Sequence, residues 1–314
     1  MYFSDALALL CAIVIFLFGM ELLCTGLEEL SQGYTQTLLS RAGDSMWRAV
    51  LFGTVVTALV QSSSAVTSVI VGLAACGMLS PRQSAGLIAG ANLGTCSTAF
   101  FVHFGLRTVQ PDFLHGILPL LVLSALLPLL LRRRCPAVLA AGAGLLALLT
   151  GMVRMQDALA QLSGSPLLIE LLSACHTPLT GFFAGIVATA VLQSSSACIA
   201  ILQASAASGV LSIGSVVPII LGQNIGTCST ALLASVRAGH TARRTALLHL
   251  QFNLLGAAAV FPVLLVLPAV CPQLLAQPAD SGAIAWVHLL CNLAAALVFL
   301  PLAAHQEAQA HRTA

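Results

Sequence analysis

Long uncharged segments alternate with short polar ones along the chain, and this alternation predicts a series of helices that cross a membrane. Such a helix needs about 20 apolar residues. The stretch 171–236, which contains no Asp, Glu, Lys or Arg, is far too long to be a single crossing. The segments expected to cross are 5–24, 82–105, 112–131, 135–153, the span that contains 222–227, 245–279 and 281–306. The more polar stretch 25–47 is expected to lie at the membrane interface.

Two further apolar segments differ from these crossings because polar residues interrupt each of them near its centre. Residues 47–60 would form a helix of about 21 Å, which is shorter than a hydrocarbon core of about 30 Å. Two short arms that meet at a polar tip predict a re-entrant hairpin at about 47–79, and the same pattern predicts a second one at about 178–211. Non-helical backbone at that depth must be covered by protein or must line a water-filled cavity.

The two predicted tips carry the same sequence. Gln-Ser-Ser-Ser-Ala stands at 61–65 and again at 193–197, and Asn-x-Gly-Thr-Cys-Ser-Thr-Ala stands at 92–99 and at 224–231. Both motifs return after 132 residues, and 23 of the 47 positions from Gly53 to Ala99 are identical to their counterparts. The chain therefore contains an internal duplication, with two runs of hydroxyl and amide side chains inside an apolar sequence.

A pair of glycines precedes the Thr-Cys-Ser-Thr run in each copy, at 90 and 94 and at 222 and 226. Glycines at such positions predict a broken transmembrane helix with exposed backbone groups, as in transporters with discontinuous helices. The alternative is that these small residues let two helices pack closely.

The number of crossings determines how the two copies are oriented. Three full crossings in the first copy are an odd number, so the second copy would begin on the opposite side of the membrane. If the first helix ends in the cytoplasm, ten arginines lie on the cytoplasmic side and two outside, as the positive-inside rule requires. The first segment has no basic leader and no cleavage site, which predicts a retained helix.

The predicted fold class is thus an all-α integral membrane protein with two inverted repeats. Each repeat would contain a re-entrant helical hairpin and a broken transmembrane helix. The first repeat would cover residues 1–134, the second 135–272, and an additional helix with a short cytoplasmic tail 273–314. We expect a plasma (inner) membrane location with the N-terminus outside and the C-terminus in the cytoplasm.

Composition agrees with a membrane protein and excludes several functions. Hydrophobic residues make up 59% of the chain and charged residues 7%, against roughly 25% charged in soluble domains. A net charge of +2 without a large basic patch argues against nucleic-acid binding. The ten cysteines lack the spacing of a zinc or disulfide motif, so they are expected in the core and no cofactor is predicted.

The polar tips have the chemistry of an ion site. Helix N-termini that point at the centre favour an anion, whereas hydroxyl, amide and carbonyl oxygens suit a small cation such as Na⁺. No Arg or Lys lies near either tip in the sequence, so co-bound cations would have to offset the charge of an anion. No Asp or Glu lies there either, which favours Na⁺ over a proton as the coupling ion.

Paired Gln-Ser-Ser-Ser motifs, each followed by Gly-x-Asn-x-Gly-Thr, resemble the sodium-dependent phosphate cotransporter family, as do His249-Leu250-Gln251-Phe252-Asn253 and His288-Leu289-Leu290-Cys291-Asn292. The resemblance implies symport of inorganic phosphate with Na⁺ by alternating access, in a bacterial member reduced to the membrane part. It implies phosphate binding by Ser62, Ser63, Ser64, Ser194, Ser195 and Ser196. It also implies Na⁺ binding or shaping of the site by Gln61, Asn92, Thr95, Gln193, Asn224 and Thr227, with Na⁺ as the only metal.

Other interpretations stay open at this point. The same scaffold could carry another small anion, such as sulfate, arsenate or a carboxylate, because serines and backbone amides bind any tetrahedral oxyanion. An intramembrane serine enzyme would need a base, and neither duplicated core holds a His or Lys beside its serines. A passive channel is a third class. The expected partners are phosphate, Na⁺ and the lipid bilayer, with a homodimer left open, and the two His-x-x-x-Asn pairs are expected to be structural.

Overall fold

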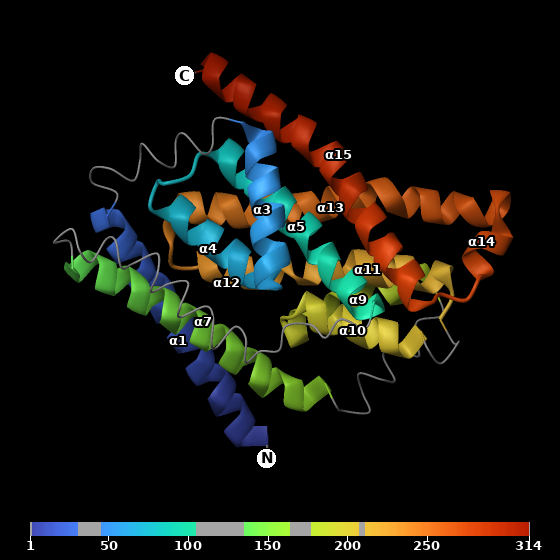
Figure 1. Ribbon diagram of the computed structural model, residues 1–314, viewed down its shortest axis with the longest axis horizontal. Helices are drawn as coiled ribbons and strands as arrows, with labels where there is room; N and C mark the ends of the chain where they lie inside the picture. Colours follow the sequence, from blue (N-terminus) through green and yellow to red (C-terminus); the bar gives the residue numbers. More distant parts are fainter. Residues whose placement is uncertain (1, 31–44, 105–134, 164–176, 207–210, 314) are drawn as a thin grey trace.

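The computed structural model describes residues 2–30, 45–104, 135–163, 177–206 and 211–313 (Figure 1). Regular structure in these ranges is helical, apart from one isolated β-bridge between Ser212 and Pro278. The helices are α1 (Tyr2–Leu30), α3 (Met46–Val60), α4 (Ser63–Ala75), α5 (Pro81–His103), α7 (Cys135–Ser163), α9 (Pro178–Leu192), α10 (Ser195–Ala206), α11 (Ile213–Gly226), α12 (Cys228–Ser235), α13 (Gly239–Val270), α14 (Pro272–Ala276) and α15 (Ser281–Thr313).

Four of the described helical segments are long and apolar enough to cross a membrane, namely Pro81–His103, Ile213–Ser235, Gly239–Leu267 and Ser281–Gln306. The protein is therefore an all-helical, multi-pass membrane protein. The predicted crossing at 5–24 lies within α1, whose described apolar stretch, Leu10–Gly19, is shorter. The predicted crossing at 112–131 and most of the interfacial stretch 25–47 lie outside the described residues, so the crossing count stays a prediction.

The duplication in the sequence is also a duplication of helices. Helices α9, α10 and α11 begin 132 residues after α3, α4 and α5, which is the offset of the sequence repeat. The span formed by α11 and α12 has the same length, 23 residues, as α5. The four predicted short arms are thus confirmed as helices, each of 12 to 15 residues.

Local sequence explains where several of these helices begin. Ser80 precedes Pro81 and accepts a hydrogen bond from the N–H of Gln83, whose side chain accepts from the N–H of Ser80. This reciprocal capping box satisfies two N–H groups that a helix start would leave without acceptors. Thr177 at α9 and Ser212 at α11 form the same arrangement.

The prediction of broken helices at the glycine pairs is wrong for the first copy. Helix α5 runs without interruption through Gly90 and Gly94, and in the second copy only Thr227, which keeps helical torsion angles, separates α11 from α12. The glycines serve close packing instead. A Cβ atom on Gly90 would overlap the carbonyl oxygen of Val50 on α3, and one on Gly222 would overlap the carbonyl oxygen of Phe182 on α9. Small residues therefore let α5 press against α3, and α11 against α9, at backbone distance.

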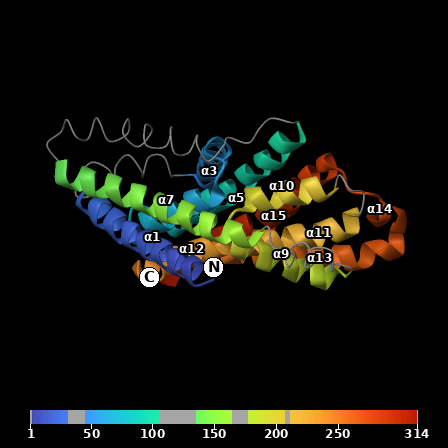
Figure 2. The same ribbon diagram turned by 90° about the horizontal axis from the view of Figure 1, so that it is seen from below.

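Helices α1 and α7 form a third close pair, which lies along one side of the molecule (Figures 1 and 2). Here too a glycine sets the approach, because a Cβ atom on Gly151 of α7 would overlap the backbone of Phe16 on α1. Phe16 is fully buried in a cluster that includes Ala65 and Val71 of α4. This cluster attaches the α1–α7 pair to the duplicated core.

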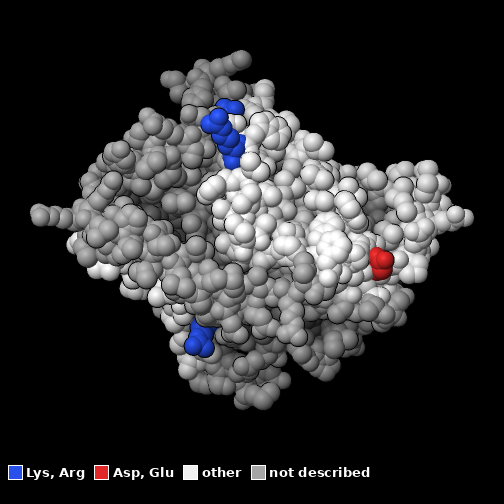
Figure 3. Space-filling view, in the orientation of Figure 1, with Lys and Arg blue, Asp and Glu red and all other residues white. Residues whose placement is uncertain are grey.

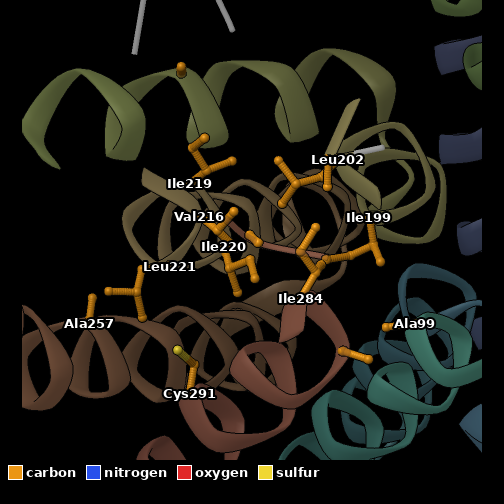
Figure 4. Close-up of a cluster of buried hydrophobic side chains, with 14 residues drawn as sticks. Ala99, Ile199, Leu202, Val216, Ile219, Ile220, Leu221, Ala257, Ile284 and Cys291 are labelled. Atoms are coloured by element: carbon orange, nitrogen blue, oxygen red, sulfur yellow. The ribbon is translucent and has the colours of Figure 1, made fainter. Parts of the chain in front are cut away.

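The core around the second copy is aliphatic (Figure 4). Ile199 and Leu202 of α10 pack with Ile219 and Ile220 of α11, and Ile284 of α15 closes the cluster. Charged side chains are few on the described part of the face in Figure 3. The ion pair between Arg237 and Glu21, at 3.8 Å, is largely exposed and adds little stability. The position of the tips therefore depends mainly on the packing of apolar helices.

Replacing Gly222 by Ala should destabilise the fold, because the added methyl group meets backbone rather than a movable side chain. Overpacking of this kind costs about 1–3 kcal/mol or more. Gly181 is the matched control at the same interface, since its Cβ would lie 3.3 Å from Ile219 Cγ1, a side-chain atom. In detergent, Gly222→Ala should melt several degrees below Gly181→Ala. Equal melting temperatures would contradict the packing role of Gly222.

Candidate functional site

Each polar tip begins with a glutamine in a backbone conformation that non-glycine residues rarely adopt. Gln61 ends α3 with φ 57°, and Gln193 ends α9 with φ 50°. They are the positive-φ residues other than glycine among the described residues. Backbone strain of this kind is typical of functional sites. It turns the chain sharply, so that the next helix starts two residues later in both copies.

The serine that follows each glutamine caps the next helix. Ser62 Oγ accepts a hydrogen bond from the N–H of Ala65 at 3.3 Å, and Ser194 Oγ accepts one from Ala197 at 3.2 Å. The remaining N–H groups of the first helical turn have no acceptor within the helix. Helices α4 and α10 therefore each present free backbone donors at their starts.

The two tips lie against each other. Ser63 Oγ and Ser195 Oγ, which occupy equivalent positions, are 3.3 Å apart, and both side chains are buried. Ser196 Oγ donates a second bond across the tips, to the carbonyl oxygen of Gln61 at 3.2 Å. Ser64, the next residue after Ser63, is also buried. The starts of α4 and α10 thus converge on one point.

The side chain of Gln61 connects the first tip to α5. Gln61 Nε2 donates to Ser97 Oγ at 3.0 Å and also to the carbonyl oxygen of Ala58, while Thr98 Oγ1 donates to Gln61 Oε1 at 2.8 Å. Ser97 and Thr98 belong to the duplicated motif, but they were not among the predicted site residues. Their contact with Gln61 depends on how α5 packs beside the first tip, which the sequence alone does not show.

The amide and hydroxyl residues predicted near the glycines have local partners. Asn92 Nδ2 donates to Ile88 O at 2.9 Å, Thr95 Oγ1 to Ala91 O at 2.8 Å, and Thr227 Oγ1 to Gln223 O at 2.9 Å. Each bond goes to the carbonyl of the preceding turn. Asn92, Thr95 and Thr227 are buried and Asn224 is half-buried.

Several buried hydroxyl oxygens in the duplicated segments have no hydrogen-bond partner in the described part of the chain. They include Thr57 Oγ1, Thr189 Oγ1 and Ser229 Oγ. Thr57 and Thr189 are equivalent residues, one turn before the two glutamines, and the predicted set of site residues omitted both. Buried polar atoms in native proteins nearly always have partners, so these oxygens suit an ion or a water molecule.

The two His-x-x-x-Asn pairs lie on α13 and α15 and are fully buried. Asn253 Nδ2 lies 3.2 Å from Cys228 Sγ of α12, and Cys96 Sγ of α5 lies 3.7 Å from the carbonyl oxygen of His288 on α15. Cys96 and Cys228 are equivalent residues. Helices α13 and α15 therefore flank the two core helices in corresponding ways.

Fold and site together define a multi-pass helical membrane protein with a duplicated core and two polar tips in contact. Residues 15–148, and again residues 145–267, match the Na⁺/Pi-cotransporter family. The chain belongs to this family, which is a family of transporters, and each of the two matches covers one copy of the duplication.

Individual relatives agree with the family match. The chain is 33% identical to the uncharacterized protein YqeW of Bacillus subtilis, over 92% of either chain. It is 27% identical, over 94% of its length, to YjbB of Escherichia coli, which is named provisionally as an inorganic phosphate export protein; the chain spans 53% of that relative. A stretch of 92 residues, 27% of this chain and 14% of the relative, is 37% identical to sodium-dependent phosphate transport protein 2A of Rattus norvegicus. No solved structure matches the chain.

Contact between the tips can be tested by cross-linking in a cysteine-free background. Ser63→Cys with Ser195→Cys should form a disulfide on mild oxidation, because the two Oγ atoms are 3.3 Å apart. Ser68→Cys with Ser195→Cys is the control, since Ser68 lies more than one turn further along α4, about 7 Å away. Mass spectrometry of tryptic peptides would detect the bond. A cross-link in the control pair alone would contradict the contact.

Proposed function

We propose that the protein is a secondary active transporter that carries inorganic phosphate together with Na⁺. The observation that carries the proposal is the contact between Ser63 and Ser195, the first residues of two helices that begin at the same duplicated motif. Free N–H groups and the positive ends of the helix dipoles meet there, and both favour an anion. Phosphate is bound by the backbone donors and hydroxyl groups of 62–64 and 194–196.

Na⁺ binds to oxygens at the other side of each tip. Helices α3 and α9 end just before Gln61 and Gln193, so their last carbonyl groups lack N–H donors within the helix. The unpartnered hydroxyls of Thr57 and Thr189 lie one turn earlier. Hydroxyl, amide and carbonyl oxygens are the ligands that transporters use for Na⁺ at discontinuous helices. Asn92, Thr95, Asn224 and Thr227 shape this site or complete the coordination.

Charge explains why the two ions travel together. The segments of the tips, 46–75 and 178–206, carry one charged residue, Arg48, near the far end of α3 from its tip. An anion of charge −1 to −2 in an apolar core is costly unless it is offset. Helix N-termini supply part of the compensation and Na⁺ supplies the rest, so phosphate binds well only when Na⁺ is present.

The two copies are inverted in the membrane, and the short arms are re-entrant. Contact between equivalent residues at Ser63 and Ser195 is what a two-fold axis between the copies produces. The corresponding placement of Cys96 beside α15 and Cys228 beside α13 agrees with such an axis. With the arginine distribution, an axis in the membrane plane lets the site open alternately to the cytoplasm and to the outside of the plasma membrane.

Purified protein in liposomes should take up ³²P-phosphate when an inward Na⁺ gradient is applied. Choline in place of Na⁺ should abolish uptake, because the anion then lacks its compensating charge. Equal uptake with choline would contradict the coupling. Phosphate uptake only when the Na⁺ gradient points outward would indicate exchange of phosphate for Na⁺, and hence export, instead of symport.

Ser63→Ala and Ser195→Ala should each lower this uptake by about tenfold or more, since a hydrogen bond to a charged group contributes about 1.5–3 kcal/mol. Ser235→Ala on α12 is the control, because it removes a buried hydroxyl whose hydrogen bond, to Leu232 O at 2.7 Å, stays within its own helix. Wild-type rates in both tip variants, at normal expression, would remove the tips from the site.

A second candidate is transport of another small anion by the same site. Backbone donors and serines fit any tetrahedral oxyanion, and the names of the relatives are what favours phosphate. Excess arsenate, which matches phosphate in shape and protonation, should compete with ³²P-phosphate uptake, whereas excess sulfate or a dicarboxylate should not. Strong inhibition by sulfate or the dicarboxylate would assign the second candidate instead.

A further inference from the structure

Equivalent residues at the two tips have different surroundings. Ala65 in the first tip is 3% exposed and packs in the cluster around Phe16, whereas its counterpart Ala197 is exposed. Ser64 is buried, and its counterpart Ser196 is half-buried. The first tip is therefore covered and the second is open, although their sequences are the same.

The hydrogen bonds of the two tips differ in the same direction. In the first copy Gln61 is held by Ser97 and by Thr98, at 3.0 Å and 2.8 Å. In the second copy the counterpart Ser229 Oγ is buried without a partner, and Thr230 Oγ1 donates its proton to the carbonyl oxygen of Thr227 at 3.1 Å. Neither hydroxyl therefore donates to Gln193. The first tip, which is covered, is thus also the tip whose glutamine is hydrogen-bonded to Ser97 and Thr98 of α5.

We propose that Gln61, Ser97 and Thr98 form a latch that keeps the first tip closed, and that Gln193, Ser229 and Thr230 form the same latch in the opposite state. In each state one latch is closed and the other is open. The role of this exchange in transport rests on the proposed function, whereas the existence of the latch rests on the hydrogen bonds above.

The threonine of each latch can change its partner at little cost, because its hydroxyl has a second acceptor within its own helix. Thr230 shows that alternative, a bond to the carbonyl three residues earlier, and Thr95 offers the equivalent carbonyl to Thr98. A threonine hydroxyl in a helix readily uses such a carbonyl. Opening the first latch thus replaces one hydrogen bond of Thr98 by another, and it frees Gln61, whose carbonyl also holds Ser196.

The latch is tested by thiol labelling of Ala65→Cys and Ala197→Cys in a background without the ten native cysteines. With a membrane-impermeant methanethiosulfonate reagent on purified protein, Ala197→Cys should react faster than Ala65→Cys. Thr98→Val, which keeps the shape but removes the donor, should lower the ratio of the two rates about fivefold, the effect of one hydrogen bond. Thr98→Ser keeps the hydroxyl and should leave the ratio unchanged.

Thr230→Val is the matched variant, and it should not lower the ratio because its latch is open in this state. An unchanged ratio in Thr98→Val, or an equal fall in Thr98→Val and Thr230→Val, would overturn the proposal. Na⁺-driven phosphate uptake by the wild type separates the two claims. Uptake without the expected change in labelling defeats the latch alone, whereas the expected labelling without uptake defeats the proposed function alone.

Discussion

A helix that stops inside an apolar protein leaves backbone N–H and C=O groups without partners, and much of this structure serves to manage that cost. Two helices stop at glutamines in the left-handed conformation, and two others start two residues later with a serine cap. Because capping is incomplete, each tip keeps free donors and acceptors. Glycines on α5 and α11 hold α3 and α9, the helices that end at the two glutamines, at backbone contact, so these helix ends stay in place.

Placing the two tips together gathers their unsatisfied groups into one candidate binding site. Neither tip alone surrounds an ion, since each offers one helix start and one helix end. Contact between Ser63 and Ser195 brings both starts to one point, and the segments that form the tips, 46–75 and 178–206, carry one charged residue, Arg48. Donors there favour an anion, the nearby oxygens favour a cation, and each ion lowers the cost of binding the other. The proposed coupling of phosphate to Na⁺ rests on this charge balance, and the proposed latch would let the unequal tips exchange their roles.

Much of this architecture could be predicted from the sequence. The repeat at 132 residues located the tips, and the length of the apolar segments located the short arms. Both properties can be seen in the order of the residues without knowledge of which helices are neighbours. The glycines at 90 and 94 were misread as helix breaks. Their spacing of four residues, on one face of a helix, is equally a packing signal, and only the neighbouring α3 decides between the two. The latch partners Ser97 and Thr98, and the unpartnered Thr57 and Thr189, depend on distances between helices that no sequence pattern reports.

The central claim is that the two tips form one site. Its most direct test is the number of phosphate ions bound per chain, measured by scintillation proximity with purified protein and ³²P-phosphate in Na⁺. The account predicts one phosphate per chain, and loss of that binding when either Ser63 or Ser195 is replaced by Ala. Two phosphates per chain, with each replacement removing one of them, would show two separate sites and contradict the account.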